Sequence, residues 1–232
     1  MRLLLIETSA KLCSAAISEN GSILAARVSD SGRSHASLTA VFVRELLDET
    51  GLRMADIDGV AVSFGPGSYT GLRVGVSTAK GLCFGSDIPL IGVGTLDVLV
   101  AGAIASAGSG PDLRAIVPVL DARRMEVYTA IYSPEGIRES EVRPEIVTPD
   151  SFSALLSEGK VLLTGDAVAK CREVITSENA VFLEADPVAS AMLVPAEKAY
   201  KEKRFEDTAY FEPFYLKEFV ATVSRKNLFQ QA

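Results

Sequence analysis

The chain opens twice with the same pattern: an apolar strand, an acidic residue, a turn and a second strand. In the first half, Glu7 separates two such strands within residues 2–19. In the second half, Asp121 separates residues 114–120 from residues 125–132. A pattern repeated at the heads of two halves indicates an internal duplication. We therefore predict an α/β protein of two similar lobes, each with helices packed on a sheet.

The other predicted elements follow from periodicity and turn signals. Asn20-Gly21 is the pair that a type I′ turn favours, which predicts a hairpin between strands 12–19 and 22–29. The remaining predicted helices are 37–49, 70–84, 96–107, 150–157, 167–175 and 189–203, and the remaining strands are 59–63, 89–93, 161–164 and 180–183.

A boundary is predicted near the middle of the chain. The 232 residues suit one large domain or two small ones that share an interface. Residues 106–111, SAGSGP, are the best candidate for the junction. We therefore expect an N-terminal lobe of residues 1–108 and a C-terminal lobe of residues 109–232.

Charge and cysteine content exclude several classes of protein. A net charge of −7 argues against unaided RNA binding, because such proteins need basic surfaces, and the chain has only a modest basic segment at Arg225 and Lys226. No apolar run approaches the roughly 20 residues of a membrane span. Cys13, Cys83 and Cys171 form no metal-binding spacing, and their odd number argues against a disulfide framework. We expect a cytoplasmic protein.

The tips of the two opening hairpins bear on nucleotide binding. In duplicated α/β folds of the actin, Hsp70 and sugar-kinase type, these hairpins hold nucleotide phosphate, and the acidic residue holds a hydrated metal. Here neither tip contains glycine, so side chains stand where phosphate needs open backbone. We predict a degenerate nucleotide site and no cofactor; the alternative is two ordinary β-turns with surface carboxylates. The residues of this site are Glu7, Thr8, Ser9 and Asp121.

Few side chains are suited to catalysis or to metal binding. His35 is the only histidine, and position 39, one helical turn later, is Thr39. A Ser–His–acid set cannot be assembled from one histidine at the start of a helix. Cys83 lies in an apolar helix, the usual place for an inert buried thiol. We therefore expect no catalytic residue and no metal site.

Residues 63–82, SFGPGSYTGLRVGVSTAKGL, combine a glycine-rich loop with glycines inside the following helix. A glycine loop that opens a helix is the usual form of an anion site, because free backbone N–H groups point outward there. Glycine inside a helix costs about 1 kcal/mol relative to alanine, and close approach of another helix can compensate for this. We therefore expect the loop to make a sharp strand-to-helix turn and the later glycines to accommodate another helix.

Helix 37–49 supports the same interpretation, because its apolar residues cover more than half of its circumference. Such a helix has more apolar surface than one sheet can cover. The alternative is that the two helices pack only against each other and their own sheet. The predicted partner interface consists of Leu38, Phe42, Leu46, Gly71, Leu72, Gly75, Thr78 and Ala79.

Several strings together resemble one family. They are LLLIETSAKLCSAAIS at the start, GPGSYTGLR at 65–73, PLIGVGTL at 89–96, DAR with EVY at 121–128, and YLK at 215–217. With these strings the chain resembles the TsaB (YeaZ) family of tRNA threonylcarbamoyladenosine biosynthesis proteins over nearly its whole length. The GPGSYTGLR string is highly specific, and the others are supportive. The family usually opens with an Asp-Thr pair, and this chain has Glu7-Thr8, which keeps the charge.

The resemblance implies a two-lobed actin-like fold of the ASKHA, ribonuclease H-like class, without catalytic activity of its own. It implies pairing with the catalytic paralogue TsaD through helices of the first lobe, and support of an ATPase, TsaE. TsaD transfers threonylcarbamoyl to the adenosine beside the tRNA anticodon. It also implies a homodimer in isolation and contact with tRNA only through the complex.

The function expected from the resemblance is a scaffold or activator subunit of this tRNA-modifying complex. Two alternatives are an actin-like ATPase or kinase that acts on its own, and a glycoprotease-type metallopeptidase. The first would require glycine-bearing phosphate hairpins, and the second more than one histidine.

Overall fold

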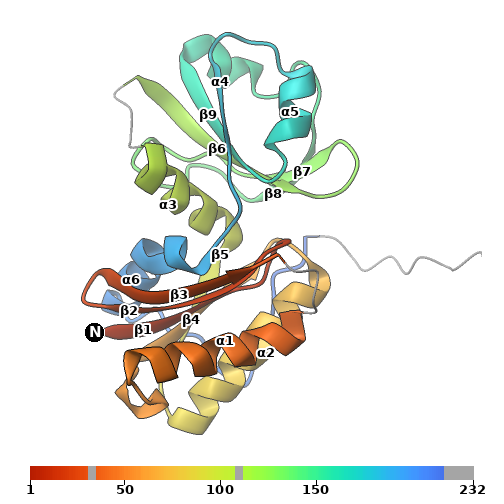
Figure 1. Cartoon of the computed structure of the whole chain (residues 1–232). Helices are drawn as coiled ribbons and strands as arrows, with labels where there is room; N and C mark the ends of the chain where they lie inside the picture. The colour runs from red at the N-terminus through yellow and green to blue at the C-terminus, as the bar shows by residue number, and fades with distance from the viewer. Residues whose placement is uncertain (31–34, 108–111, 217–232) are drawn as a thin grey trace, which may run out of the picture.

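The computed structural model describes residues 1–30, 35–107 and 112–216 (Figure 1). The first part contains β1 (Arg2–Glu7), β2 (Cys13–Glu19), β3 (Ser22–Ser29), α1 (His35–Thr50), η1 (Met54–Asp56), β4 (Gly59–Gly65), α2 (Tyr69–Ser86), β5 (Leu90–Gly94) and α3 (Thr95–Ala107). The second contains β6 (Leu113–Asp121), β7 (Glu126–Thr129), β8 (Arg143–Ile146), α4 (Ser153–Glu158), β9 (Lys160–Gly165), α5 (Val168–Val174) and β10 (Ala180–Glu184), followed by η2 (Ala189–Met192) and α6 (Leu193–Lys201).

These described residues form two five-stranded sheets of the same design. The orders are β3-β2-β1-β4-β5 and β8-β7-β6-β9-β10. In each sheet the first strand lies at the centre, pairs antiparallel with the second, and pairs parallel with a later strand. The two outer strands continue these directions. The matching order confirms the duplicated two-lobed α/β fold predicted from the repeated opening.

Local sequence explains the central strands and the β2–β3 hairpin. Five of the six residues of β1 are buried, as expected for a strand covered on both faces. Asn20 and Gly21 have φ values of 49° and 84°, the left-handed conformation of a type I′ turn. The predicted hairpin is therefore confirmed. The strand predicted at 125–132 ends earlier, at Thr129, and β8 was not predicted, because its sequence, RPEI, is only four residues long and contains a proline, which is uncommon within a strand.

The first sheet is covered on both faces. Leu4 and Ile6 of β1 pack with Phe42 of α1 and Val76 of α2 on one side. Residues of the opposite face of β1 pack with η2 and α6, which follow the second lobe in sequence (Figure 1). Because residues 189–201 return to this sheet, we propose a first lobe of residues 1–107 together with 189–216, in place of the division at 108/109.

Helix α3 connects the two lobes. Its apolar residues, among them Leu99 and Ala103, share a core with Ile116 and Tyr132 of the second lobe (Figure 1). The Tyr132 hydroxyl donates a hydrogen bond of 2.7 Å to Oδ1 of Asp97 near the start of α3. The lobes are thus held at one side of the molecule by apolar packing and a buried phenol.

After α6 the chain crosses the open edge of the first sheet as a segment that we call the strap, residues 202–216. Glu206 pairs with Leu90 of the edge strand β5. The Phe214 amide donates a 2.7 Å hydrogen bond to the carbonyl of Phe64. The strap therefore covers the β5 edge and ends beside the glycine loop. Among the helices in the described ranges, none has the length and apolar character needed to cross a bilayer.

Candidate functional site: the cleft between the lobes

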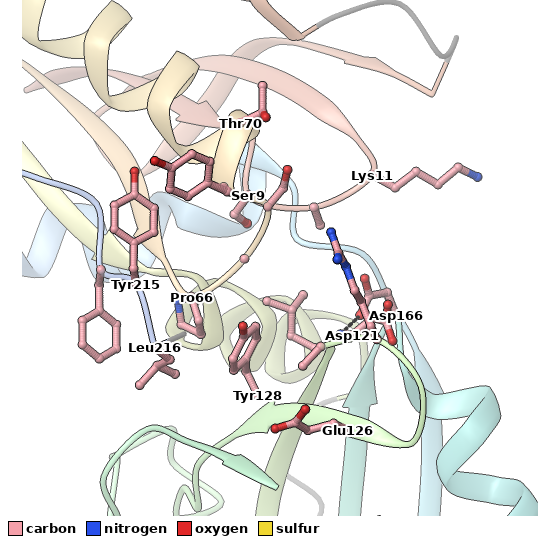
Figure 2. Close-up of a pocket in the computed structure, with 18 of the residues that line it drawn as sticks. Ser9, Lys11, Pro66, Thr70, Asp121, Glu126, Tyr128, Asp166, Tyr215 and Leu216 are labelled. Atoms are coloured by element: carbon pink, nitrogen blue, oxygen red, sulfur yellow. Dashed lines mark hydrogen bonds between the residues drawn. The ribbon is translucent and has the colours of Figure 1, made fainter. Parts of the chain in front are cut away.

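A cavity of about 830 Å³ lies between the two lobes (Figure 2). The first hairpin and the glycine loop form one side of it, and the second hairpin forms another. Tyr215 and Leu216, at the end of the strap, close a third side. The residues predicted at the two hairpin tips, Ser9 and Asp121, are therefore brought to one cavity, as the duplication implies.

The residues at the tip of the first hairpin are buried and hydrogen-bonded within the protein. Glu7 and Thr8 are fully buried, and Ser9 is 1% exposed, which corrects the alternative of a surface carboxylate at this turn. Oε1 of Glu7 accepts hydrogen bonds from the Ser9 amide at 2.6 Å and from Oγ of Ser63 at 2.8 Å. Burial raises the pKa of Glu7 and favours its neutral form. Because Glu7 is fully buried, neither of its carboxyl oxygens is exposed to the cavity, where a hydrated metal would lie.

The glycine loop packs directly on this hairpin. The Ser68 amide donates a 2.6 Å hydrogen bond to the Ser9 carbonyl. Gly67 has a φ of 155°, and a Cβ there would lie 2.3 Å from the same carbonyl oxygen. A Cβ on Gly65 would lie 2.5 Å from the Phe214 carbonyl oxygen of the strap. The loop glycines therefore allow the backbones of the first hairpin, the glycine loop and the strap to meet.

Gly71 and Gly75 of α2 face the protein's own first hairpin and sheet. Oγ1 of Thr8 donates a 2.8 Å hydrogen bond to the Gly71 carbonyl, and a Cβ on Gly75 would lie 2.3 Å from that same Oγ1. This close approach corrects the expectation that the glycines accommodate a partner helix. Six of the predicted interface residues are buried inside the first lobe: Phe42, Leu46, Gly71, Leu72, Gly75 and Ala79. Leu38 and Thr78 are half-buried.

An ammonium group binds the tip of the second hairpin. Nζ of Lys170, on α5, donates hydrogen bonds to the Asp121 carboxylate, to the Arg124 carbonyl at 2.9 Å and to the Glu126 carbonyl at 2.6 Å. The Asp121 amide donates to Oδ1 of Asp166 at 2.8 Å. Lys170 and Asp166 were not predicted as site residues. Both bond to Asp121, which lies more than 40 residues earlier, and no local sequence pattern indicates so distant a contact.

The carboxyl group of Asp166 gives this hairpin a pH dependence. Burial, and then the nearby charges of Asp121 and Asp186, raise the pKa of Asp166 from 3.8 to about 6. The folded chain therefore keeps a proton that the unfolded chain has released between about pH 4 and pH 6. Stability falls as the pH rises through this window.

We expect Asp166→Asn to stabilise the chain by about 2 kcal/mol near pH 7 and to remove this slope. The amide oxygen can still accept from the Asp121 amide, and no charge is then buried. Urea denaturation of both forms at several pH values between about 4 and 7 measures the effect. An equal pH slope in the two forms would contradict the assignment.

The cysteines and the histidine contribute little to the site. Cys13, Cys83 and Cys171 are buried free thiols, which confirms the prediction for Cys83. Burial raises the pKa of Cys83 and of Cys171 to about 11. Helix α1 begins at His35, whose side chain lies outside the described part of the structure. No group of three or more His, Cys, Asp or Glu residues within the described ranges is placed to hold a metal ion.

Comparisons with known proteins agree with this arrangement. The family model for TsaD, tRNA N6-adenosine threonylcarbamoyltransferase, matches residues 27–224. The chain is 33% identical to the tRNA threonylcarbamoyladenosine biosynthesis protein TsaB of Escherichia coli, over 95% of this chain and 96% of that protein. The chain belongs to the TsaB family. The resemblance found in the GPGSYTGLR string is thus confirmed.

Two solved structures resemble the fold of this chain. A crystal structure from Pseudomonas aeruginosa, of a protein described as similar to peptidase YeaZ, superposes with a TM-score of 0.80 at 25% identity, covering 93% of this chain and 99% of that one. The activator of 2-hydroxyisocaproyl-CoA dehydratase from Clostridium difficile, with bound ADPNP, superposes with a TM-score of 0.52 at 13% identity, covering 88% and 96%. The second likeness concerns the fold alone, and both agree with the predicted actin-like class.

Proposed function

We propose that the chain is a non-catalytic scaffold subunit in the formation of threonylcarbamoyladenosine beside the anticodon of tRNA. In this proposal it binds a catalytic paralogue of the TsaD type and supports an ATPase of the TsaE type. Membership of the TsaB family supports a role in this tRNA modification. The observation that carries the non-catalytic role is the hydrogen bond from the Ser68 amide to the Ser9 carbonyl, because it joins the tip of the first hairpin to the chain's own glycine loop.

The second hairpin supports the same role. The ammonium group of Lys170 bonds the Asp121 carboxylate, which in an active actin-like enzyme would help to hold a metal and a nucleotide. Both hairpin tips therefore have internal partners. An actin-like ATPase acting alone needs at least one tip with open backbone, and a metallopeptidase needs a cluster of metal ligands.

The surface that we propose for the partner is the solvent-facing side of α2. Phe84 is 84% exposed, an unusual degree for a phenylalanine on a regular helix. A Cβ on Gly81 or Gly85, which flank it, would meet no atom within 4 Å. An exposed aromatic side chain between two uncovered glycines leaves room for a partner helix to approach closely. This surface replaces the buried residues Leu72, Gly75 and Ala79 as the candidate interface.

We expect Phe84→Glu to weaken binding of a TsaD-type partner at least tenfold and to leave the melting temperature of the isolated chain unchanged. The side chain is exposed, so its loss removes little packing within the monomer. Titration calorimetry with the partner and thermal denaturation measure the two effects. Ile137→Glu, at a 64% exposed position of the second lobe, is the control and should bind normally.

The same preparations test catalysis. The pure chain should neither hydrolyse ATP in the presence of magnesium nor modify tRNA, and reconstituted modification should fall in parallel with partner binding. Steady-state turnover by the pure chain that is lost in Asp121→Ala would instead establish the ATPase alternative. Normal partner binding by Phe84→Glu would contradict the proposed interface.

A further inference from the structure

The tip of the second hairpin carries two consecutive residues in the left-handed conformation. Arg123 and Arg124 have φ values of 73° and 50°. The β2–β3 turn of the same chain also has two consecutive residues with positive φ, Asn20 and Gly21, at 49° and 84°, in a two-residue turn between the paired residues Glu19 and Ser22. Asparagine and glycine are the favoured residues for this turn, and other residues there cost on the order of 1 kcal/mol each. The second tip thus has two arginines at positions where asparagine and glycine would be more favourable.

The backbone of this tip is fixed while its side chains remain available. The Arg123 carbonyl accepts from the Glu126 amide at 3.1 Å, and the Arg124 carbonyl accepts from Lys170 at 2.9 Å. Both arginines are exposed and line the cavity between the lobes. Within the described ranges, neither guanidinium group takes part in a salt bridge or a side-chain hydrogen bond. A rigid turn therefore presents two cations to the cavity.

An aromatic pair lines the same cavity from the first lobe. The rings of Tyr69 and Tyr215 lie 4.9 Å apart between centroids, and the guanidinium group of Arg73 lies 4.7 Å from the Tyr69 ring centre. Tyr215 is 39% exposed. Figure 2 shows Tyr215 across the cavity from Asp121, the residue that begins the arginine-bearing turn. The two rings are tilted by 37° to each other. Neighbouring aromatic rings with an adjacent arginine form a surface on which a nucleobase can stack.

We propose that this cavity binds a single-stranded segment of RNA, with a base stacked on Tyr215 and phosphates bound by Arg123 and Arg124. Guanidinium groups bind phosphate through paired charge-assisted hydrogen bonds. The choice of RNA rests on the proposed function. A free nucleoside triphosphate offers the same base and phosphate chemistry, but the closed backbone of both hairpins provides no cradle for its phosphate chain.

The net charge of −7 limits the affinity of the chain alone, so the site contributes mainly within the tRNA-modifying complex. Direct measurement on the full chain therefore requires low salt. The probe is a fluorescently labelled oligouridylate, followed by anisotropy, with ATP and magnesium in a parallel titration.

The decisive variant combines Arg123→Asn with Arg124→Gly. Its turn then has the Asn-Gly pair of the β2–β3 turn, which adopts positive φ readily, so the melting temperature should hold or rise while RNA binding is lost. The slope of log affinity against log salt should decrease by about one for each arginine removed. Arg53→Asn with Lys203→Gly is the matched control. It removes the same charge at exposed positions outside the cavity, one of which, Lys203, also has a positive φ of 55°.

A second variant, Tyr215→Leu, should weaken oligouridylate binding about tenfold and change the salt slope little, because stacking is largely uncharged. The proposal is overturned if the arginine pair and its control lose RNA binding equally, or if ATP binds at this cavity and the oligonucleotide does not. Partner binding is measured separately with the TsaD-type protein. If partner binding is absent and the RNA results hold, the proposed function fails and the RNA site stands.

Discussion

Gly75→Ala is expected to lower the free energy of unfolding of the isolated chain by about 2–3 kcal/mol. The added Cβ would lie 2.3 Å from Oγ1 of Thr8 and 3.3 Å from Cγ2 of Val62. Thr8 cannot move aside at low cost, because it is fully buried and donates its hydrogen bond to the Gly71 carbonyl. Chemical denaturation of the isolated chain measures the loss, and leucine at this position should cost more than alanine.

Gly81→Ala is the matched control on the same helix. A Cβ there would meet no atom within 4 Å, so alanine should stabilise the chain by up to about 1 kcal/mol through helix propensity. The double variant Thr8→Ala with Gly75→Ala should recover part of the loss, since it removes the conflicting hydroxyl. An unchanged stability for Gly75→Ala would contradict the packing seen here and would return the glycine to a partner interface.

Gly67→Ala is expected to have the larger effect, about 3–4 kcal/mol. The added Cβ would lie 2.3 Å from the Ser9 carbonyl oxygen and 3.1 Å from its carbon, and backbone atoms cannot rotate away as a side chain can. Moving the loop outward would break the 2.6 Å hydrogen bond from the Ser68 amide to Ser9. The same denaturation experiment measures the loss.

Gly51→Ala separates the two causes of that loss. Gly51 also has a positive φ, 67°, but a Cβ there would meet no atom within 4 Å. Alanine at this position should therefore cost only the conformational strain, about 1 kcal/mol. Equal losses at Gly51 and Gly67 would show that contact with Ser9 contributes nothing.

Much of the fold could be predicted from the sequence, because its signals are local. The apolar runs, the Asn20-Gly21 turn and the repeated strand-acid-turn-strand opening each depend on neighbouring residues, and each is found in the structure. The same order of strands in both sheets follows from the duplication. In the GPGSYTGLR string, which carries the family resemblance, Gly65 and Gly67 each lie so close to a backbone oxygen that a side chain would not fit.

The candidate site was less predictable, because its contacts join segments far apart in the chain. The sequence left open that Glu7 lies at the surface of an ordinary β-turn, but packing of the glycine loop over the turn buries it fully. Periodicity showed that α2 carries a glycine stripe and could not show which neighbour the stripe faces. Lys170 and the strap were outside any local pattern.

The sequence by itself determined most of the strands and helices, the duplication and the family, since backbone preference and hydrophobic period act over a few residues. Only the tertiary structure decided that Gly67 and Gly75 pack against the first hairpin, that Lys170 closes the second, and that Arg123 and Arg124 line the cavity with Tyr215. The physical reason is that a glycine or a charged residue in the sequence indicates only that other atoms come close or that a charged group is nearby. Which atoms these are depends on how the two lobes and the strap pack together.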